Sequence, residues 1–269
     1  MARLPGKVIL LRKSVVMAVL AIVAACAIFG AVALPAAITT TAAARQLPIY
    51  SVERAEGEKL CAISFDAAWG NEDTQKLIDI LAEYNVKTTF FVVGDWVDKY
   101  PESVKALADA GHEVMSHSDH HDHYNTLSRE QIVADINASC QKIEAVTGSR
   151  PTLIRCPYGE YDDHVISAVR SLGMEPIQWD VDSLDWKDYD ADTIFRRVTE
   201  HVAPGSIVLF HNAALHTPEA LPSILQYLQG QGYTVVPIGQ LIYREGYTID
   251  HTGRQFLAES GEQQPEGEA

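Results

Sequence analysis

With 269 residues, of which 47% are hydrophobic, the chain can bury the core of one large α/β domain with appendages. Its formal net charge of −15 excludes nucleic acid as a partner, because polyphosphate binding needs a basic face. An anionic polymer of the cell envelope would likewise have to be held by local contacts, since long-range charge would not attract it.

The N-terminal segment places basic residues before an uncharged run, 14–38. Basic residues in this position orient the N-terminus toward the cytoplasm. The run of about 25 residues is longer than a typical signal-peptide core and long enough to span a bilayer. Because 42–44 also offers a small-residue cleavage site, we expect 1–44 to be a single-pass membrane anchor, the favoured interpretation, or a cleaved export signal. Both place the domain outside the cytoplasm, either anchored or secreted.

Apolar strands and amphipathic helices alternate after a predicted linker, 45–58. Near-continuous apolar strands joined by helices are typical of a parallel sheet that is buried on both faces. We therefore predict a distorted or incomplete (β/α) barrel of about seven parallel strands. A C-terminal extension, 244–269, follows the domain, and its acidic, polar end is expected to be disordered. The predicted strands are 59–66, 87–93, 112–116, 152–155, 174–179, 206–211 and 233–237, and the helices are 72–84, 97–110, 128–146, 162–172, 192–202 and 218–229.

Polar residues follow five of the predicted strands directly or within a short loop. In a parallel barrel these strand ends converge on one face, so the five side chains are expected to share one site. Each residue alone also fits a structural role, such as a helix cap, a surface ion pair or a core histidine. The five residues are Asp66, His117, Arg155, Asp185 and His211.

The densest polar segment, 113–124, holds four histidines with two aspartates between them. Neutral imidazole is the commonest protein ligand for borderline divalent metals. His117 and His121 are four positions apart, so one helical turn would direct both side chains the same way. Alternatively, the segment is a solvated polar loop with metal affinity and no chemistry. The four cysteines (Cys26, Cys61, Cys140 and Cys156) contain no Cys-x-x-Cys, which argues against a structural zinc site or a disulfide framework.

Taken in order, the polar segments resemble the motifs of the polysaccharide deacetylases, the NodB-homology domain of carbohydrate esterase family 4. The resemblance covers 59–243. The Asp-Ala-Ala-Trp-Gly variant of the first motif and the ending 247–253 are most similar to the sporulation-associated PdaB-like branch. The five motifs are Ser64–Gly70, His117–His121, Arg155–Tyr158, Asp182–Trp186 and Leu209–His211.

The resemblance implies a metal-assisted hydrolysis. A divalent metal, with zinc first and cobalt, manganese or nickel as alternatives, would be held by His117 and His121 and would polarise an N-acetyl carbonyl. Asp66 would be the general base, and Arg155 would keep it ionised and oriented. The backbone N–H of Tyr158 would help to stabilise the oxyanion.

The remaining motif residues would serve the leaving group and the acetyl pocket. His211 would be the general acid that protonates the departing amine, because an amide anion leaves very poorly. Asp185 would orient His211 and keep it cationic. Trp186 and Leu209 would enclose the acetyl methyl group.

One position departs from the family pattern. The family usually has Asp-Asp in the first motif, where the second Asp is the third metal ligand, whereas this chain has Ala67. Catalytic zinc sites normally have three protein ligands, so two histidines alone would bind metal weakly. The candidate substitutes are Asp119, His120, Asp122 and His123, with Asp73 a more distant one.

These observations lead to one principal hypothesis and two alternatives. The principal one is an extracytoplasmic, metal-dependent de-N-acetylase, a hydrolase of carbon–nitrogen bonds that acts on peptidoglycan or a chitin-like glycan, with a role in sporulation. The first alternative is a catalytically impaired family member that binds envelope glycan, which Ala67 favours. The second is a metal-storage or metal-sensing histidine loop, which leaves the other four motifs unexplained.

Overall fold

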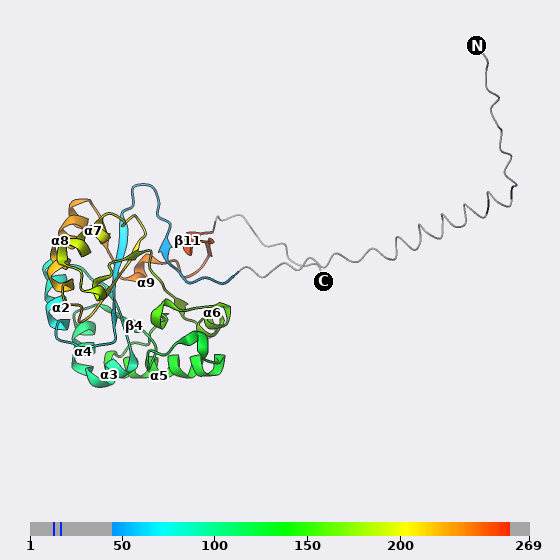
Figure 1. Ribbon diagram of the computed structural model, residues 1–269, viewed down its shortest axis with the longest axis horizontal. Coiled ribbons are helices and arrows are strands. Elements are labelled where there is room, and N and C mark those ends of the chain that lie inside the picture. Colours follow the sequence, from blue (N-terminus) through cyan, green and yellow to red (C-terminus); the bar gives the residue numbers. More distant parts are fainter. Residues whose placement is uncertain (1–12, 14–16, 18–44, 259–269) are drawn as a thin grey trace, which may run out of the picture. The chain divides into compact units, whose positions relative to one another are not determined.

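The computed structural model describes residues 13, 17 and 45–258. The predicted anchor or signal, apart from Lys13 and Met17, and the acidic end of the tail lie outside the described residues. Among the residues that are described, no helix has both the length and the apolar character needed to cross a membrane. Figure 1 shows the domain, with its helices surrounding the strands.

The main sheet is parallel throughout, in the order β6-β5-β4-β3-β2-β8-β7, with β9 pairing with the start of β2. The seven strands of this order form a half-barrel with β6 and β7 at its two ends, which confirms the predicted incomplete barrel. The strands are β2 (Leu60–Ala67), β3 (Thr89–Val92), β4 (Glu113–Ser116), β5 (Leu153–Ile154), β6 (Glu175–Pro176), β7 (Val181–Asp182), β8 (Ile207–His211) and β9 (Thr234–Val235).

The helices match the predicted segments with one division and one addition, the short helix α9, which was not predicted. The predicted helix 97–110 is two helices, because Pro101 lacks an N–H and begins a new helix. The predicted capping box at Ser128 and Gln131 is present at the start of α5. The helices are α2 (Thr74–Glu83), α3 (Gly94–Lys99), α4 (Pro101–Asp109), α5 (Arg129–Thr147), α6 (Asp163–Arg170), α7 (Ala191–Thr199), α8 (Thr217–Gly230) and α9 (Ile238–Leu241).

A second, three-stranded sheet extends the packed domain on both sides of the predicted range 59–243. It joins β1 (Ser51–Val52) to β11 (Arg254–Leu257) in parallel, and β11 to β10 (Tyr247–Ile249) in antiparallel fashion. The predicted linker therefore contains a buried strand, and the predicted C-terminal extension contains a hairpin. Pairing between segments some 200 positions apart leaves no local sequence signal, which is why the sequence placed both outside the domain.

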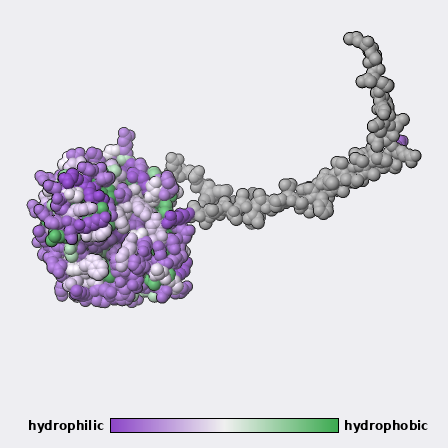
Figure 2. All heavy atoms as spheres, viewed as in Figure 1, coloured by the Kyte–Doolittle hydropathy of each residue, from purple (hydrophilic) through white to green (hydrophobic). Residues whose placement is uncertain are grey.

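Strand β2 divides its side chains between two environments, as the period of two along a strand requires. Ile63, Phe65 and Ala67 belong to the core between the sheet and the outer helices. Ser64 and Asp66 instead contact the buried Arg155 guanidinium. The exterior is mainly hydrophilic on the face drawn in Figure 2, in keeping with a chain of which 21% is charged.

Candidate active site

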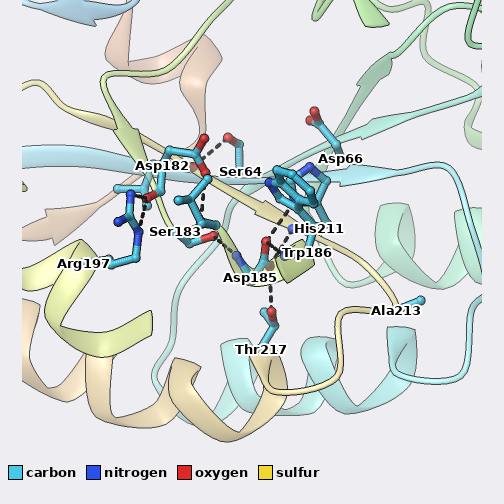
Figure 3. A network of polar contacts seen from close by, with 12 residues as sticks. Ser64, Asp66, Asp182, Ser183, Asp185, Trp186, Arg197, His211, Ala213 and Thr217 are labelled. Atoms are coloured by element: carbon cyan, nitrogen blue, oxygen red, sulfur yellow. Dashed lines mark hydrogen bonds and ion pairs between the residues drawn. The ribbon is translucent and has the colours of Figure 1, made fainter. Parts of the chain in front are cut away.

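The site begins on the two central strands, where Asp66 of β2 and His211 of β8 are register partners. The two residues are therefore neighbours on adjacent strands at the carboxyl edge of the sheet. Figure 3 shows both residues together with the Asp185 network beneath His211. This placement agrees with the predicted convergence of strand ends.

Asp66 is fixed by a buried ion pair with Arg155. Arg155 Nη1 donates to Asp66 Oδ1 at 2.7 Å, and Nη2 donates to Ser64 Oγ at 2.9 Å and to the carbonyl oxygen of Gln178 at 3.2 Å. The Arg155 side chain is fully buried, and that of Asp66 is 7% exposed. Burial raises the pKa of Asp66, but the charges of Arg155, His117 and His211 outweigh burial and leave that pKa below its usual value. Asp66 is therefore ionised near neutral pH.

His117 lies next to Asp66 and is held in one orientation. Its Nδ1 donates to the carbonyl oxygen of Arg155 at 2.7 Å, which leaves Nε2 with a lone pair, 3.6 Å from Asp66 Oδ2. Burial lowers the pKa of His117, so the ring is neutral at pH 7. A neutral, oriented imidazole is the form that binds a metal ion.

His121 is the second predicted ligand, and its ring centroid lies 4.9 Å from that of His117. Burial lowers the pKa of His121 to about 4. Its Nδ1 is buried and has no hydrogen-bond partner among residues 45–258. A buried imidazole nitrogen without a partner is costly unless an ion or a proton donor meets it. Both histidines therefore fit a divalent cation as nitrogen ligands.

The candidate substitute ligands have other contacts. Asp119 contacts Lys142 Nζ at 2.8 Å through Oδ1 and His120 Nε2 at 3.2 Å through Oδ2. His120 also contacts Asp95, and His123 contacts Glu160 Oε1 at 2.9 Å, while Asp122 is exposed. In the described part of the chain, no hydrogen bond or ion pair joins any of these four substitutes to His117 or His121. The more distant Asp73 accepts a hydrogen bond from the Ala213 backbone.

Three of the neighbouring side chains form a separate group. Ligand atoms of Asp119, His120 and Asp135 lie within 4.8 Å of one another, a spacing that a metal ion could use. The Lys142 ammonium group already supplies a positive charge to Asp119 there. Two of the four candidate substitutes, Asp119 and His120, thus belong to a neighbouring cluster.

His211 is paired with a fully buried carboxylate. Its Nδ1 donates to Asp185 Oδ1 at 2.8 Å, and its backbone N–H donates to Oδ2 at 2.9 Å. Thr217 Oγ1 also donates to Oδ2, at 2.6 Å (Figure 3). Burial lowers the pKa of His211, but the hydrogen bond and charge of Asp185 outweigh burial, so that pKa is raised above its usual value.

Replacing Asp185 with Asn is therefore expected to lower the pKa of His211, because Asn keeps the shape and removes the charge. Titration of the His211 ring proton by NMR measures this shift. Asp188→Asn, on the same loop and exposed, is the control and should leave the titration unchanged. An unchanged pKa of His211 in Asp185→Asn would contradict the assigned role of the Asp185 charge.

Two of the other predicted pocket residues, Tyr158 and Trp186, lie on loops at the same edge, and the third, Leu209, lies on β8. Tyr158 packs its ring between His121 and His123, with centroids 4.5 and 4.0 Å away. Trp186 is 56% exposed, whereas Leu209 is buried within β8. Ala67 is 1% exposed and ends β2 in the helix-side core.

Backbone strain concentrates at this edge of the sheet. Of seven residues other than glycine with positive φ in the described chain, only Asn85 lies elsewhere. Left-handed backbone costs a side-chain-bearing residue on the order of 1 kcal/mol, and such strain gathers at functional sites. The six at the carboxyl edge are Ser118, His121, Tyr158, Leu184, Asp188 and Ala213.

Sequence reasoning missed some residues that the structure brings to the site. Ser64 holds the Arg155 guanidinium, Thr217 holds the Asp185 carboxylate, and Trp69 lies at the mouth with its ring centroid 5.9 Å from that of His121. Ser64 and Trp69 belong to the first motif, which could have indicated them. Thr217 begins α8 and gave no local signal.

The carboxyl edge of this half-barrel carries an ionised carboxylate, a paired histidine and two neutral imidazoles, the groups that a hydrolase needs. Comparison with known families makes the class specific: the family model described as "Polysaccharide deacetylase" matches residues 53–177. The chain is 30% identical over 192 residues to peptidoglycan-N-acetylmuramic acid deacetylase PdaA of Bacillus subtilis, covering 70% of this chain and 73% of PdaA. The chain belongs to the polysaccharide deacetylase family, as its motifs indicated. The PdaB-like branch stays a prediction.

Two further relatives include one protein named as a deacetylase and one described as a pseudoenzyme. Peptidoglycan-N-acetylmuramic acid deacetylase PdaC of Bacillus subtilis is 35% identical over 184 residues, which are 68% of this chain and 39% of PdaC. The chain thus spans about two fifths of that relative's length. The structure of BA3943 from Bacillus anthracis, described as a CE4 family pseudoenzyme, is 34% identical with a TM-score of 0.70, over 74% of this chain and 69% of that one.

Proposed function

We propose that the chain is an extracytoplasmic, metal-dependent de-N-acetylase of peptidoglycan amino sugars. The observation that carries the proposal is the pairing of an ionised Asp66 with a charge-supported His211 on adjacent strands. The relatives PdaC and PdaA are named for deacetylation of peptidoglycan N-acetylmuramic acid, which supports this substrate class. Action outside the cytoplasm rests on the uncharged run 14–38, and a role in sporulation rests on the first-motif variant and the ending 247–253.

Asp66 is suited to be the general base. Because the charge of Arg155 holds its pKa below the usual value, Asp66 is ionised and ready to accept a proton from the attacking water. Arg155 Nη1 occupies Oδ1, so Oδ2 is the oxygen that remains to accept the proton. The fully buried guanidinium keeps the carboxylate from rotating away.

His211 is suited to be the general acid. Asp185 occupies Nδ1, so Nε2 is the atom that would give its proton to the departing amine. The raised pKa of His211 keeps that proton available at neutral pH. Base and acid thus lie side by side across the sheet, as hydrolysis of an amide requires.

A divalent cation held by His117 and His121 would act as a Lewis acid that polarises the acetyl carbonyl, with zinc first among the candidates. The backbone N–H of Tyr158 would donate to the oxyanion. Trp186 and Leu209 would exclude water from around the acetyl methyl group.

A second candidate function is glycan binding without catalysis. Two observations favour it: Ala67 takes the place of the usual ligand, and BA3943 is described as a pseudoenzyme. A BA3943 mutant is described as having restored enzymatic activity, at 35% identity and a TM-score of 0.69. Whether this chain is an impaired enzyme can therefore be tested by substitutions that would restore activity.

Acetate release from peptidoglycan and from chitooligosaccharides tests the proposal. We expect release by the wild type with Zn²⁺, Co²⁺, Mn²⁺ or Ni²⁺ added, and loss after chelation. His211→Gln should abolish release. His201→Gln, at an exposed position just after α7, should not. Glycan binding without acetate release under every metal would contradict the enzyme and support the second candidate.

A further inference from the structure

Exposed apolar side chains gather at the loops that follow the strands. Within residues 45–258, six large hydrophobic side chains are exposed, and only Leu257, on β11, lies away from these loops. A soluble domain gains nothing by exposing aromatic rings unless something covers them. The other five are Trp69, Tyr158, Trp186, Tyr189 and Leu215, which follow β2, β5, β7 and β8.

Trp69 is the most exposed of these aromatic side chains, at 67%, yet its backbone is firmly held. Asn212 Nδ2 donates to the Trp69 carbonyl oxygen at 3.0 Å and to that of Gly70 at 2.6 Å. Trp96 Nε1 also donates to the Gly70 carbonyl, at 2.7 Å. A loop with no other task would not need three hydrogen bonds to two successive carbonyl groups. The hydrogen bonds therefore present the indole to solvent in a fixed place.

The Trp69 indole also lies next to the proposed metal ligand His121, although it has no role in the proposed hydrolysis. Trp69 follows Asp66 by three residues, and its ring meets that of His121 edge-on, at 5.9 Å and an interplanar angle of 62°. An edge contact leaves most of the indole surface open to a ligand.

We propose that Trp69 is a specificity residue that stacks on a sugar ring of the glycan, next to the sugar whose acetyl group lies at His121. This inference rests on the proposed function, because it assigns the substrate of the same site. The flat apolar face of a pyranose is uncharged, which suits a chain with a net charge of −15. An aromatic ring fixed in advance loses little conformational freedom on binding, so stacking there adds affinity at small entropic cost.

Calorimetric titration with N-acetylated chitotetraose in the presence of Zn²⁺ tests the inference on the full chain. Trp69→Ala should weaken binding about five- to tenfold, the range expected for one aromatic stacking contact. Trp69→Phe keeps an aromatic face and should bind within about threefold of the wild type. Leu257→Ala removes an exposed hydrophobe from the other sheet and should leave binding unchanged. Circular dichroism establishes that each variant is folded.

Acetate release from the same preparations separates the two proposals. Wild type that binds the tetrasaccharide more tightly than Trp69→Ala, but releases no acetate, would overturn deacetylation and leave stacking standing. Equal binding by wild type and Trp69→Ala would overturn stacking, whatever the acetate release. Failure of the wild type to bind, or equal weakening in Leu257→Ala, would also overturn it.

Discussion

Asp66→Asn is expected to lower the free energy of unfolding by about 3–5 kcal/mol at pH 7, because it leaves a buried charge without its partner. The Arg155 side chain is fully buried, and its Nη1 lies 2.7 Å from Asp66 Oδ1. The stacked rings of Phe91 and Trp179, 4.3 and 5.4 Å from Arg155 Cζ, cannot replace a carboxylate. Urea unfolding followed by circular dichroism measures the loss. Asp79→Asn, exposed on α2, should change stability by less than about 0.5 kcal/mol.

The destabilisation should also depend on pH in a defined direction. Asp66 has a pKa below its usual value in the folded protein, so its charge contributes stability above the unfolded-state pKa of about 4. That contribution is lost as pH falls through the lower, folded-state pKa. The stability difference between wild type and Asp66→Asn should therefore be full at neutral pH and shrink in acid. A difference that stays constant into strong acid would contradict the ion pair as its source.

The Asp66→Asn variant also shows whether Asp66 acts as the general base or as a metal ligand. Asp66→Asn should abolish acetate release, since Asn cannot accept the proton of water, while zinc bound through His117 and His121 should be largely retained. Isothermal titration with Zn²⁺ measures the second property. Loss of zinc binding in Asp66→Asn would instead make Asp66 a ligand, which its 3.6 Å distance from His117 Nε2 would then explain.

The half-barrel could be predicted because most of the predicted strands are near-continuous apolar segments, and five of them are followed by a polar residue. Asp66 and His211 could be brought together from that pattern alone, since parallel strands end at one edge. Strand β7 escaped because it lies in a segment, 180–186, whose three aspartates give it the polar composition of a loop.

The orientation of the histidine segment could not be predicted in the same way. Ser118 and His121 both have positive φ, at 72° and 59°, although neither is a glycine. With these two turns His117 faces Asp66 and His121 faces His117, while Asp119 and His120 face Lys142 and Asp95. Residue type rarely predicts left-handed backbone at positions other than glycine. The number of potential ligands in the segment therefore suggested substitute ligands whose side chains the fold directs elsewhere.

Ala67→Asp is expected to strengthen zinc binding about tenfold or more, because it restores the first-motif carboxylate that serves as third protein ligand in the family pattern. Ala67 ends β2, and its carbonyl oxygen accepts a hydrogen bond from Val93 N at 3.0 Å. Its side chain shares the helix-side core with Val92 and Trp96. The new carboxylate must therefore turn toward the metal or stay in apolar surroundings.

Because the new carboxylate has these two possible orientations, the thermal stability of Ala67→Asp should depend on bound metal. Without zinc, the introduced carboxylate would be a charge buried among hydrophobic groups, so Ala67→Asp should melt at a lower temperature than the wild type in the presence of chelator. Zinc should reverse that loss, because binding to the folded state alone stabilises it. Ala68→Asp, one residue further on, adds the same charge from a different direction and should gain no zinc affinity. If zinc bound Ala67→Asp no more tightly than the wild type, the missing first-motif ligand would not be what limits the metal site.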